Sequence, residues 1–328
     1  MKPKVLITCK VFPQTIERLA PLCDLTLNDS DEIKSASELS SMMAPMDGVM
    51  TSITEKIDAA LLGCCPRLKV VSNIATGYSN IDVKACSERG VMVTNTPGVL
   101  EDTTADLTFA LLLAAARRVT EAEVWLRAGE WKKGFALQQL LGCDVHHATL
   151  GIIGMGSIGQ AIARRARGFD MQVIYNNRKR LDATVEQKLG ASFADMLDLL
   201  ARADFVVAMA PYSAETHHLI GAREIGLMKP TAILINSARG GVVDDAALIE
   251  ALKAGRIAGA GLDVFENEPR LNSDYLKLRN VVLTPHIGSA TLATRMKMAM
   301  LAAENLSAAL SGNVPPNLVN RDVLDHVH

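Results

Sequence analysis

The chain has 328 residues, 49% of them hydrophobic, and a formal net charge of −2 at pH 7. This length allows two domains with separate cores, because domains typically hold about 100–200 residues. The near-neutral charge and the lack of a basic block argue against a nucleic-acid partner. We recognise no N-terminal secretion signal, and no apolar run reaches the roughly 18 residues of a membrane span, so we expect no membrane partner.

Cysteine usage indicates a reducing compartment. The spacing of the six cysteines matches neither a zinc site nor a C-x-x-C redox motif. Cys64 and Cys65 are adjacent in the chain, which is an awkward geometry for a mutual disulfide. We therefore expect reduced thiols, no metal site and a cytoplasmic location.

The first hundred residues alternate short apolar strands with amphipathic stretches. Strands are predicted at residues 4–9, 47–52, 68–75 and 91–96. This alternation is typical of βαβ units, which form a parallel sheet. Residues 94–98, with the sequence TNTPG, are expected to leave this sheet as a linker.

Two helices and a second series of strands follow. The first helix is predicted over residues 101–118, and the second carries Trp125 and ends near Gly129. Residues 130–147 have no regular pattern. A second parallel sheet is then expected, with strands at Thr149–Ile153, Gln172–Tyr175, Asp204–Ala208, Ala232–Asn236, Gly259–Asp263 and Val281–Thr284.

The last predicted helix, Leu292–Leu310, is rich in Ala and Met. It has to pack on a domain that is already formed, because its apolar residues need a partner surface. We therefore predict an α/β protein with two domains. One domain is built from residues 1–98 and 290–328, and the other from residues 99–289.

A glycine motif opens the second series of strands. The hexapeptide Gly154-Met155-Gly156-Ser157-Ile158-Gly159 follows an apolar strand and precedes a helical pattern, which is the context that a dinucleotide-binding loop requires. The glycines permit a tight turn, close approach of a pyrophosphate and close packing of the helix. The helix N-terminus offers free N–H groups to the phosphates. The alternative is a glycine-rich turn that binds no ligand.

The end of the next strand bears on the cofactor. Enzymes that bind NAD usually carry an acidic residue there for the ribose 2′-hydroxyl. This chain instead has Asn176 and Asn177, followed by Arg178, Lys179 and Arg180. Cations without a carboxylate suit a 2′-phosphate, so we predict that NADP(H) is preferred and that NAD(H) is possible. The alternative is a solvated basic turn.

Three further polar residues are expected at strand ends of the same sheet. Arg239, Glu268 and His286 each follow a predicted strand, and ligands of parallel sheets bind beyond the carboxyl ends of the strands. Reduction of a small 2-oxo acid requires a cation for the substrate, a proton donor and a carboxylate that orients this donor. We predict these three roles for Arg239, His286 and Glu268. Singly, each residue is also compatible with a structural role.

The chain resembles the D-2-hydroxyacid dehydrogenase family over nearly its whole length. The resemblance rests on the segments NIATGYSNIDV, LGIIGMGSIGQAIARRA, LTPHIGSAT and NSARGGVVDDAALIEALKAGRIAGAGLDVFENEP. Within the family it is most similar to bacterial glyoxylate/hydroxypyruvate reductases that also act on 2-ketogluconate. The resemblance implies two Rossmann-like domains with parallel sheets: a flavodoxin-like substrate domain and a dinucleotide-binding domain.

The resemblance also assigns residues. The backbone N–H groups of Thr76 and Gly77 would receive the substrate carboxylate together with Arg239. Asp263 would help to hold the nicotinamide, and the family implies a homodimer through residues 101–145. Besides the glycine motif and the basic turn, the positions that match the cofactor site of the family are Thr104, Pro211, Thr216, Ala238, Asp263 and Gly288.

The chain departs from the family at some positions. Ser157 stands where an Arg is frequent in close relatives, and Phe135 stands where a second Trp is often found, besides Trp131. Substrate preference is therefore the least secure part of the resemblance. We expect an NADP(H)-preferring reductase of glyoxylate, hydroxypyruvate or 2-ketogluconate. The alternatives are an enzyme of the D-3-phosphoglycerate dehydrogenase type and a non-catalytic, dinucleotide-sensing protein similar to a corepressor.

Overall fold

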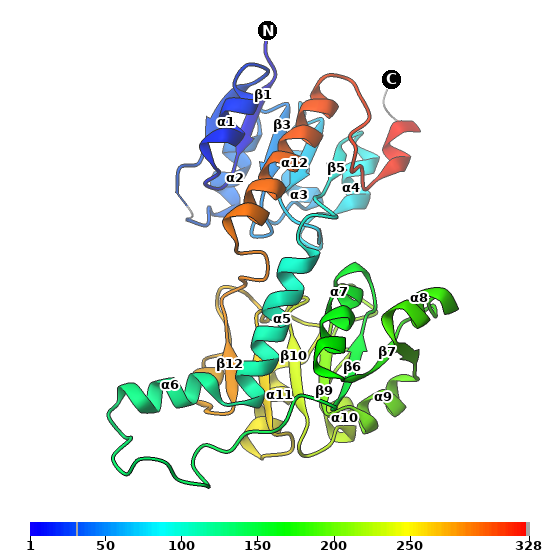
Figure 1. Cartoon of the computed structure of the whole chain (residues 1–328). Helices are drawn as coiled ribbons and strands as arrows, with labels where there is room; N and C mark the ends of the chain where they lie inside the picture. The colour runs from blue at the N-terminus through cyan, green and yellow to red at the C-terminus, as the bar shows by residue number, and fades with distance from the viewer. Residues whose placement is uncertain (31, 326–328) are drawn as a thin grey trace. The chain divides into compact units, whose positions relative to one another are not determined.

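The computed structural model describes residues 1–30 and 32–325, and the chain divides into two compact units (Figure 1). The first unit comprises Met1–Leu100 and the described residues of Ala290–His328. The second unit comprises Glu101–Ser289. The chain thus leaves the first unit after Leu100 rather than after residue 98, and it re-enters this unit at residue 290.

The sheet of the first unit has five parallel strands in the order β2-β1-β3-β4-β5. This is the strand order of flavodoxin-like folds. The edge strand β2 was not predicted, because its residues alternate between exposed and half-buried and form no apolar run. The strands are β1 (Lys4–Ile7), β2 (Asp24–Leu27), β3 (Gly48–Thr51), β4 (Val70–Asn73) and β5 (Met92–Thr94).

Alternate residues of these strands face two separate hydrophobic cores. The C-terminal helix α12 (Leu292–Leu310) covers one face: Leu306 is buried on it, and Ser72 of β4 donates a hydrogen bond to the carbonyl oxygen of Ala302. This packing explains why a helix so distant in sequence belongs to the first unit. The other helices of this unit are α1 (Pro13–Leu19), α2 (Ala36–Met43), α3 (Ala59–Gly63), α4 (Val83–Glu88) and the 3-10 helix η3 (Arg321–Asp325).

The sheet of the second unit has seven parallel strands in the order β12-β11-β10-β9-β6-β7-β8. The direction of winding reverses between β6 and β9, and ligands of such sheets bind beside this reversal. The three-residue edge strand β8 was not predicted. The strands are β6 (Thr149–Ile153), β7 (Gln172–Asn176), β8 (Ala191–Phe193), β9 (Phe205–Ala208), β10 (Ile233–Asn236), β11 (Gly259–Leu262) and β12 (Val281–Leu283).

Helices cover the second sheet, except for one helix that stands apart from it. Helix α5 packs on β10, β11 and α7, whereas α6 has no buried residue, and α6 and the chain after it extend away from the sheet (Figure 1). Residues 130–147 lack helix and strand, as predicted. The helices are α5 (Glu101–Ala116), α6 (Val119–Arg127), α7 (Ser157–Ala166), α8 (Ala183–Leu189), α9 (Met196–Arg202), α10 (Ala222–Leu227), α11 (Asp245–Lys253) and the 3-10 helices η1 (Arg167–Phe169) and η2 (Ser273–Lys277).

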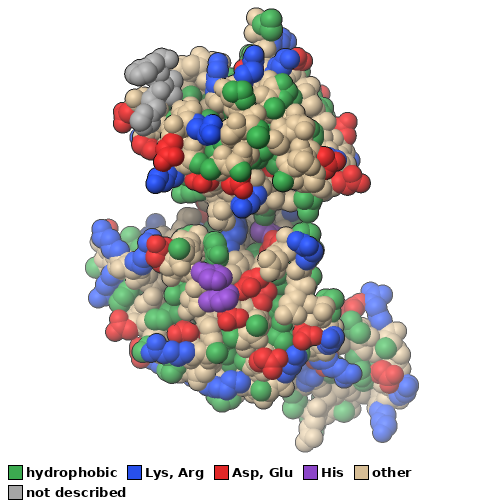
Figure 2. Space-filling view, turned by 180° about the vertical axis from the view of Figure 1, so that it is seen from behind, with side chains coloured by type: hydrophobic (Ala, Val, Ile, Leu, Met, Phe, Trp, Pro, Cys, Tyr) green, Lys and Arg blue, Asp and Glu red, His purple; other side chains and the backbone are tan. Residues whose placement is uncertain are grey.

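The apolar length of the helices and the distribution of surface charge both bear on the sequence predictions. Among the described residues, no helix combines the length and the apolar character that crossing a bilayer requires. Figure 2 shows acidic and basic side chains interspersed over the visible face of each unit. This mixing agrees with the small formal net charge of −2.

Candidate active site

The glycine motif forms the turn between β6 and α7, and each glycine has its own physical reason. Gly154 has a φ of +104°, and a Cβ there would lie 2.5 Å from the backbone of Met209. A Cβ at Gly159 would lie 2.4 Å from the carbonyl oxygen of Gly154. A Cβ at Gly156 would meet no described atom within 4 Å. The outer side of the turn is therefore open, and it fits a pyrophosphate that approaches the backbone closely.

Helix α7 begins directly at this opening. Its N-cap is Gly156, and no described side chain caps the helix. The N–H groups of the first turn thus remain available to an anion, and the helix dipole favours a negative charge there. The backbone N–H of Met155 donates to Oδ1 of Asn177 at 2.7 Å, which ties the turn to the end of β7.

The basic turn after β7 contains arginines in two different situations. Both side chains, Arg178 and Arg180, are exposed. Arg180 in addition donates from Nε and Nη2 to both oxygens of Glu186, at 2.9 and 2.8 Å. Tyr175 also donates to Glu186, at 2.6 Å. These hydrogen bonds, foremost the one from Arg180, lower the pKa of the Glu186 carboxyl to about 2.

A hydrogen-bonded pair joins two of the three predicted active-site residues. Nδ1 of His286 lies 2.7 Å from Oε2 of Glu268, and the backbone N–H of Phe265 donates to Oε1 of the same carboxylate at 2.8 Å. Both side chains remain partly accessible, with 26% and 30% exposed. Because a carboxylate only accepts, Nδ1 carries the proton of this bond, and Nε2 is the ring nitrogen that can exchange a proton with a ligand.

Arg239 lies in the loop after β10 and is partly buried. Its Nη1 donates to the carbonyl oxygen of Ala238 at 2.8 Å, and Asn236 donates to the carbonyl oxygen of Arg239 at 3.2 Å. Burial lowers the pKa of the Arg239 guanidinium, and the charge of Glu268 acts in the opposite direction. The group keeps its charge, because an arginine is not deprotonated in proteins. Arg239 is therefore a desolvated cation near a carboxylate.

Asp263 organises the loop that carries His286. The carboxylate accepts hydrogen bonds from Thr284 at 2.6 Å and from the N–H groups of Ile287 and Gly288 at 2.8 Å each. Asp263 is 1% exposed, and its burial raises the pKa of the carboxyl. In this structure both oxygens therefore hold the segment around His286, and the contact with the nicotinamide that the family resemblance implies stays a prediction.

The remaining predicted cofactor positions lie in the same unit. Thr216 closes the loop after β9, since its hydroxyl donates to the carbonyl oxygen of Pro211 at 2.7 Å. The N–H of Ala238 donates to Asn236 at 3.2 Å. Thr104 of α5 is buried beside Gly288: a Cβ at that glycine would lie 3.4 Å from its methyl group. These contacts show how the loops are held.

Thr76 and Gly77 belong to the first unit, in the loop after β4. The N–H of Thr96 donates to the carbonyl oxygen of Ala75 at 2.9 Å, and Asn95 donates to that of Thr76 at 2.7 Å. In a trans peptide the N–H points away from the carbonyl of the same plane. These two hydrogen bonds therefore fix the directions of the Thr76 and Gly77 N–H groups.

Sequence reasoning missed the residues that hold these groups. Asn95 lies where the predicted strand 91–96 and the predicted linker 94–98 overlap, and Glu186 lies on α8, outside every motif. His218 belongs to no motif of the sequence, and its position between two carboxylates could not be foreseen. Asn95 and His218 meet partners 19 and 48 residues away, and the pairing of Glu186 with Arg180, six residues before it, depends on the fold of the turn between β7 and α8.

Comparison with known proteins supports these assignments at the level of the family. Residues 109–288 match the NAD binding domain of the D-isomer specific 2-hydroxyacid dehydrogenases. A glyoxylate reductase from Thermococcus litoralis is 49% identical over 327 residues, which cover 99% of this chain and 98% of the relative. The match thus extends well beyond the cofactor domain.

Solved structures agree with this result. A protein from Thermus thermophilus has a TM-score of 0.89 and 41% identity, covering 96% of this chain and 99% of its own. An NADPH-dependent glyoxylate/hydroxypyruvate reductase from Sinorhizobium meliloti, solved with NADP and malonate, has a TM-score of 0.86 and 34% identity, covering 98% of each chain. The second unit is therefore a domain that binds a nicotinamide dinucleotide, and the chain belongs to the D-isomer specific 2-hydroxyacid dehydrogenase family.

Proposed function

We propose that this enzyme uses NADPH to reduce small 2-oxo acids, glyoxylate first among them, to D-2-hydroxy acids. The observation that carries the proposal is the 2.7 Å hydrogen bond between Glu268 and His286, in a nicotinamide-dinucleotide domain that also carries Arg239. The relative from Thermococcus litoralis supports glyoxylate, and the structure from Sinorhizobium meliloti supports hydroxypyruvate as well. The extension to 2-ketogluconate rests on the sequence resemblance alone.

The three residues divide the chemistry among them. Nε2 of His286 gives a proton to the carbonyl oxygen of the substrate, and Glu268 stabilises the protonated ring and fixes its orientation. Arg239 attracts the substrate carboxylate and draws electron density towards the carbonyl oxygen. The nicotinamide cofactor, when bound, supplies the hydride.

We assign the substrate carboxylate to Thr76 and Gly77 as well as to Arg239. Two backbone N–H groups of fixed direction cost no reorganisation when an anion binds, so they favour a substrate with a carboxylate next to the reacting carbonyl. This assignment explains why the substrate class is 2-oxo acids rather than simple aldehydes or ketones.

We assign the cofactor to the turn between β6 and α7 and to the neighbouring loops. The pyrophosphate lies on the glycine motif, with Met155, Ser157 and Ile158 in the same turn. Asn177, Arg178 and Arg180 surround the 2′-phosphate, so NADP(H) is preferred and NAD(H) remains usable. The loops that line the rest of the cofactor contain Thr104, Pro211, Thr216, Ala238, Asp263 and Gly288.

Two further assignments concern the setting of the enzyme. No disulfide joins the cysteines that the structure describes, which suits a reducing compartment, so we place the enzyme in the cytoplasm. The exposed apolar side chains of α6 and the chain after it suit a second copy of the chain, so we propose a homodimer that uses residues 101–145.

The test is a set of initial rates for glyoxylate, hydroxypyruvate and 2-ketogluconate, each with NADPH and with NADH. We expect turnover of glyoxylate, with NADPH preferred. His286→Ala is expected to lower kcat by on the order of 10²–10⁴, because the proton donor is lost, while the Kd for NADPH changes little. Undiminished turnover of this variant contradicts the assignment of His286. No turnover by the wild type with any pair contradicts the proposed function.

A further inference from the structure

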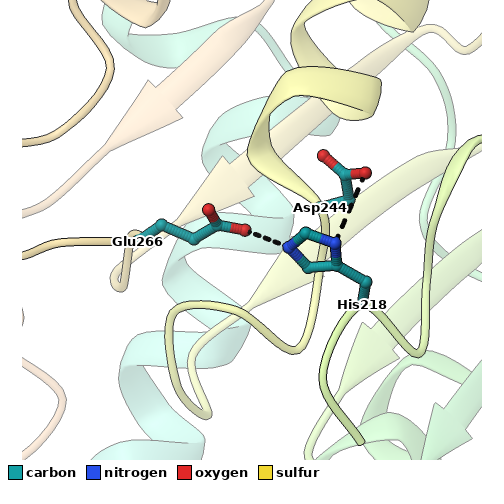
Figure 3. A group of neighbouring side chains, drawn as sticks. All are labelled: His218, Asp244 and Glu266. Carbon is teal, nitrogen blue, oxygen red and sulfur yellow. Dashed lines mark hydrogen bonds and ion pairs between the residues drawn. The ribbon is translucent and has the colours of Figure 1, made fainter.

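A histidine outside these three residues lies between two carboxylates (Figure 3). Nε2 of His218 lies 2.7 Å from Oε1 of Glu266, and Nδ1 lies 3.6 Å from Oδ2 of Asp244. The three side chains come from the loop after β9, the loop after β11 and the N-cap of α11. Because a carboxylate only accepts, His218 donates to Glu266. The imidazole thus joins segments that are distant in sequence.

The backbone of the same residue holds the segment after Arg239. The N–H of His218 donates to the carbonyl oxygen of Gly241 at 2.7 Å, and Ile220 pairs with Val243 in a parallel bridge. His218 has a φ of +52°, a conformation that is uncommon for residues other than glycine. Its hydrogen bonds offset the cost of this conformation.

Glu266 links His218 to the segment that contains Glu268. Its backbone N–H donates to Oδ2 of the buried Asp245 at 3.0 Å, and its side chain accepts from His218. The adjacent N–H of Phe265 donates to the carboxylate of Glu268 at 2.8 Å. Residues 265–268 are therefore held from both sides, by Asp245 at the backbone and by His218 at the Glu266 side chain.

The segments of Arg239 and Glu268 also touch one another. A Cβ at Gly240 would lie 1.8 Å from the carbonyl oxygen of Phe265, so the two backbones are in direct contact. His218 holds both of them, one through Gly241 and the other through Glu266. A displacement of either segment would move Arg239 or Glu268 relative to His286.

We propose that His218 is a positioning residue of the reductase reaction: it clamps the two segments that carry Arg239 and Glu268. This inference rests on the proposed function, because it acts through residues assigned there. The same three side chains, His218, Asp244 and Glu266, are also of types that bind divalent cations, and their ligand atoms lie within 4.8 Å of one another. Here, however, the ring nitrogen and Glu266 satisfy each other directly.

Three substitutions separate the clamp from a general loss of structure. His218→Gln keeps an N–H donor at about the position of Nε2. His218→Asn tolerates the left-handed backbone but is too short to reach Glu266, and His218→Ala removes the donor altogether. His146→Gln is the matched control, because His146 is an exposed histidine of the same unit outside these segments.

We expect kcat for glyoxylate to fall by about 10-fold to 100-fold in His218→Ala and His218→Asn, because small displacements of active-site groups have effects of this size. The KM for NADPH is expected to change less than about twofold, His218→Gln to retain most of the activity, and His146→Gln to match the wild type. Equal losses in the Gln and Ala variants would overturn the clamp.

A double variant tests whether His218 affects kcat through Glu268. If His218 acts through Glu268, then His218→Ala lowers kcat much less in a Glu268→Gln background than in the wild type. An undiminished effect in that background overturns this route. Wild type without any turnover would instead contradict the proposed function, and the clamp would then be judged by hydrogen exchange.

Hydrogen exchange of the backbone reports on the clamp independently of activity. The N–H groups of Phe265 and Glu266 are both hydrogen-bonded here, so their exchange should accelerate in His218→Ala and not in His146→Gln. Unchanged exchange overturns the clamp.

A chelation experiment tests whether the cluster is instead a metal site. If a chelator abolishes wild-type activity, Zn²⁺ restores it and His218→Gln shows no such response, the cluster is a metal site and the clamp is overturned.

Discussion

Arg178 and Arg180 show how two residues of one charge can serve different purposes. Both residues are exposed and follow β7, but Arg180 is committed to Glu186 through two hydrogen bonds. A guanidinium held by a buried carboxylate is well positioned but has fewer free donors for a phosphate. We therefore expect Arg178 to contribute more than Arg180 to the recognition of NADPH.

The preference for NADPH over NADH tests whether Arg178 contributes more than Arg180. Arg178→Ala should raise the KM for NADPH by roughly 10-fold and leave the KM for NADH nearly unchanged, because only NADPH carries the 2′-phosphate. Arg180→Ala should alter the preference less. Steady-state rates with both cofactors measure the two effects. If neither variant changes the ratio of NADPH to NADH, the basic turn is a solvated surface feature.

The pair Arg180–Glu186 should make stability depend on acid pH. The pKa of Glu186 is lowered from 4.5 to about 2 in the folded chain, so the pair stabilises the fold above about pH 4.5 and this stabilisation is lost as the pH falls towards 2. Arg180→Ala should therefore lower the Tm at pH 7, and the difference from the wild type should narrow below pH 4.5. Thermal unfolding followed by circular dichroism measures it. A Tm difference that is the same at pH 7 and near pH 2 would show that the ionised carboxylate of Glu186 does not cause it.

At the scale of the element, the loop after β4 is shaped by side chains from elsewhere in its unit. Asn73 donates to the carbonyl oxygen of Gly77 at 2.8 Å, and Asn95 donates to that of Thr76 at 2.7 Å. Asn73 is fully buried, so its amide has no access to water as an alternative partner. The loop is thus set before any substrate arrives.

Removal of the Asn95 amide should weaken this preorganisation. In Asn95→Asp a carboxylate faces the carbonyl oxygen of Thr76, so we expect the KM for glyoxylate to rise by about 10-fold and the KM for NADPH to stay near that of the wild type. Steady-state kinetics measure both constants. Asn313→Asp, at an exposed position of the same unit, is the control for the added charge. A rise in both KM values would show that Asn95 acts on more than the carboxylate loop.

At the scale of the whole molecule, the second unit carries apolar side chains that are exposed to solvent. No residue of α6 is buried, and Phe135 and Leu137 expose 87% and 83% of their surface. Exposed apolar surface of this kind marks an interaction site. The neighbouring side chains that share this exposure are Val119, Val124, Leu126, Trp131 and Leu141.

The oligomeric state tests whether a second copy covers these side chains. We expect the wild type to have a mass of about twice the 35.2 kDa of one chain, and the double variant Phe135→Ser, Leu137→Glu to shift towards a single chain. Light scattering after gel filtration measures the mass. Leu276→Glu, which changes an exposed leucine outside residues 101–145, should remain at the wild-type mass. A wild type that elutes at the mass of one chain contradicts the homodimer.

Much of the fold could be predicted because the strands next to the glycine motif are continuous apolar runs. Strand β9 and the other central strands are buried on both faces, so their sequences are continuous apolar runs that predict strands. The edge strands β2 and β8 were missed because neither forms an apolar run: β2 alternates between exposed and half-buried residues, and β8 has the exposed Ser192 at its centre. The extent of α5 was overestimated by two residues, since Arg118 adopts a φ of +55° and ends the helical path.

By itself, the sequence determined the two-sheet α/β architecture, the glycine turn and the three polar residues at strand ends. These features depend on local properties: apolar runs, the conformational freedom of glycine and the direction of parallel strands. Only the tertiary structure decided that Glu186 holds Arg180, that Asn95 orients the Thr76 carbonyl and that His218 lies between Asp244 and Glu266. Asn95 and His218 have partners 19 and 48 residues away, and even Arg180 and Glu186, six residues apart, meet only after the turn and the helix have folded.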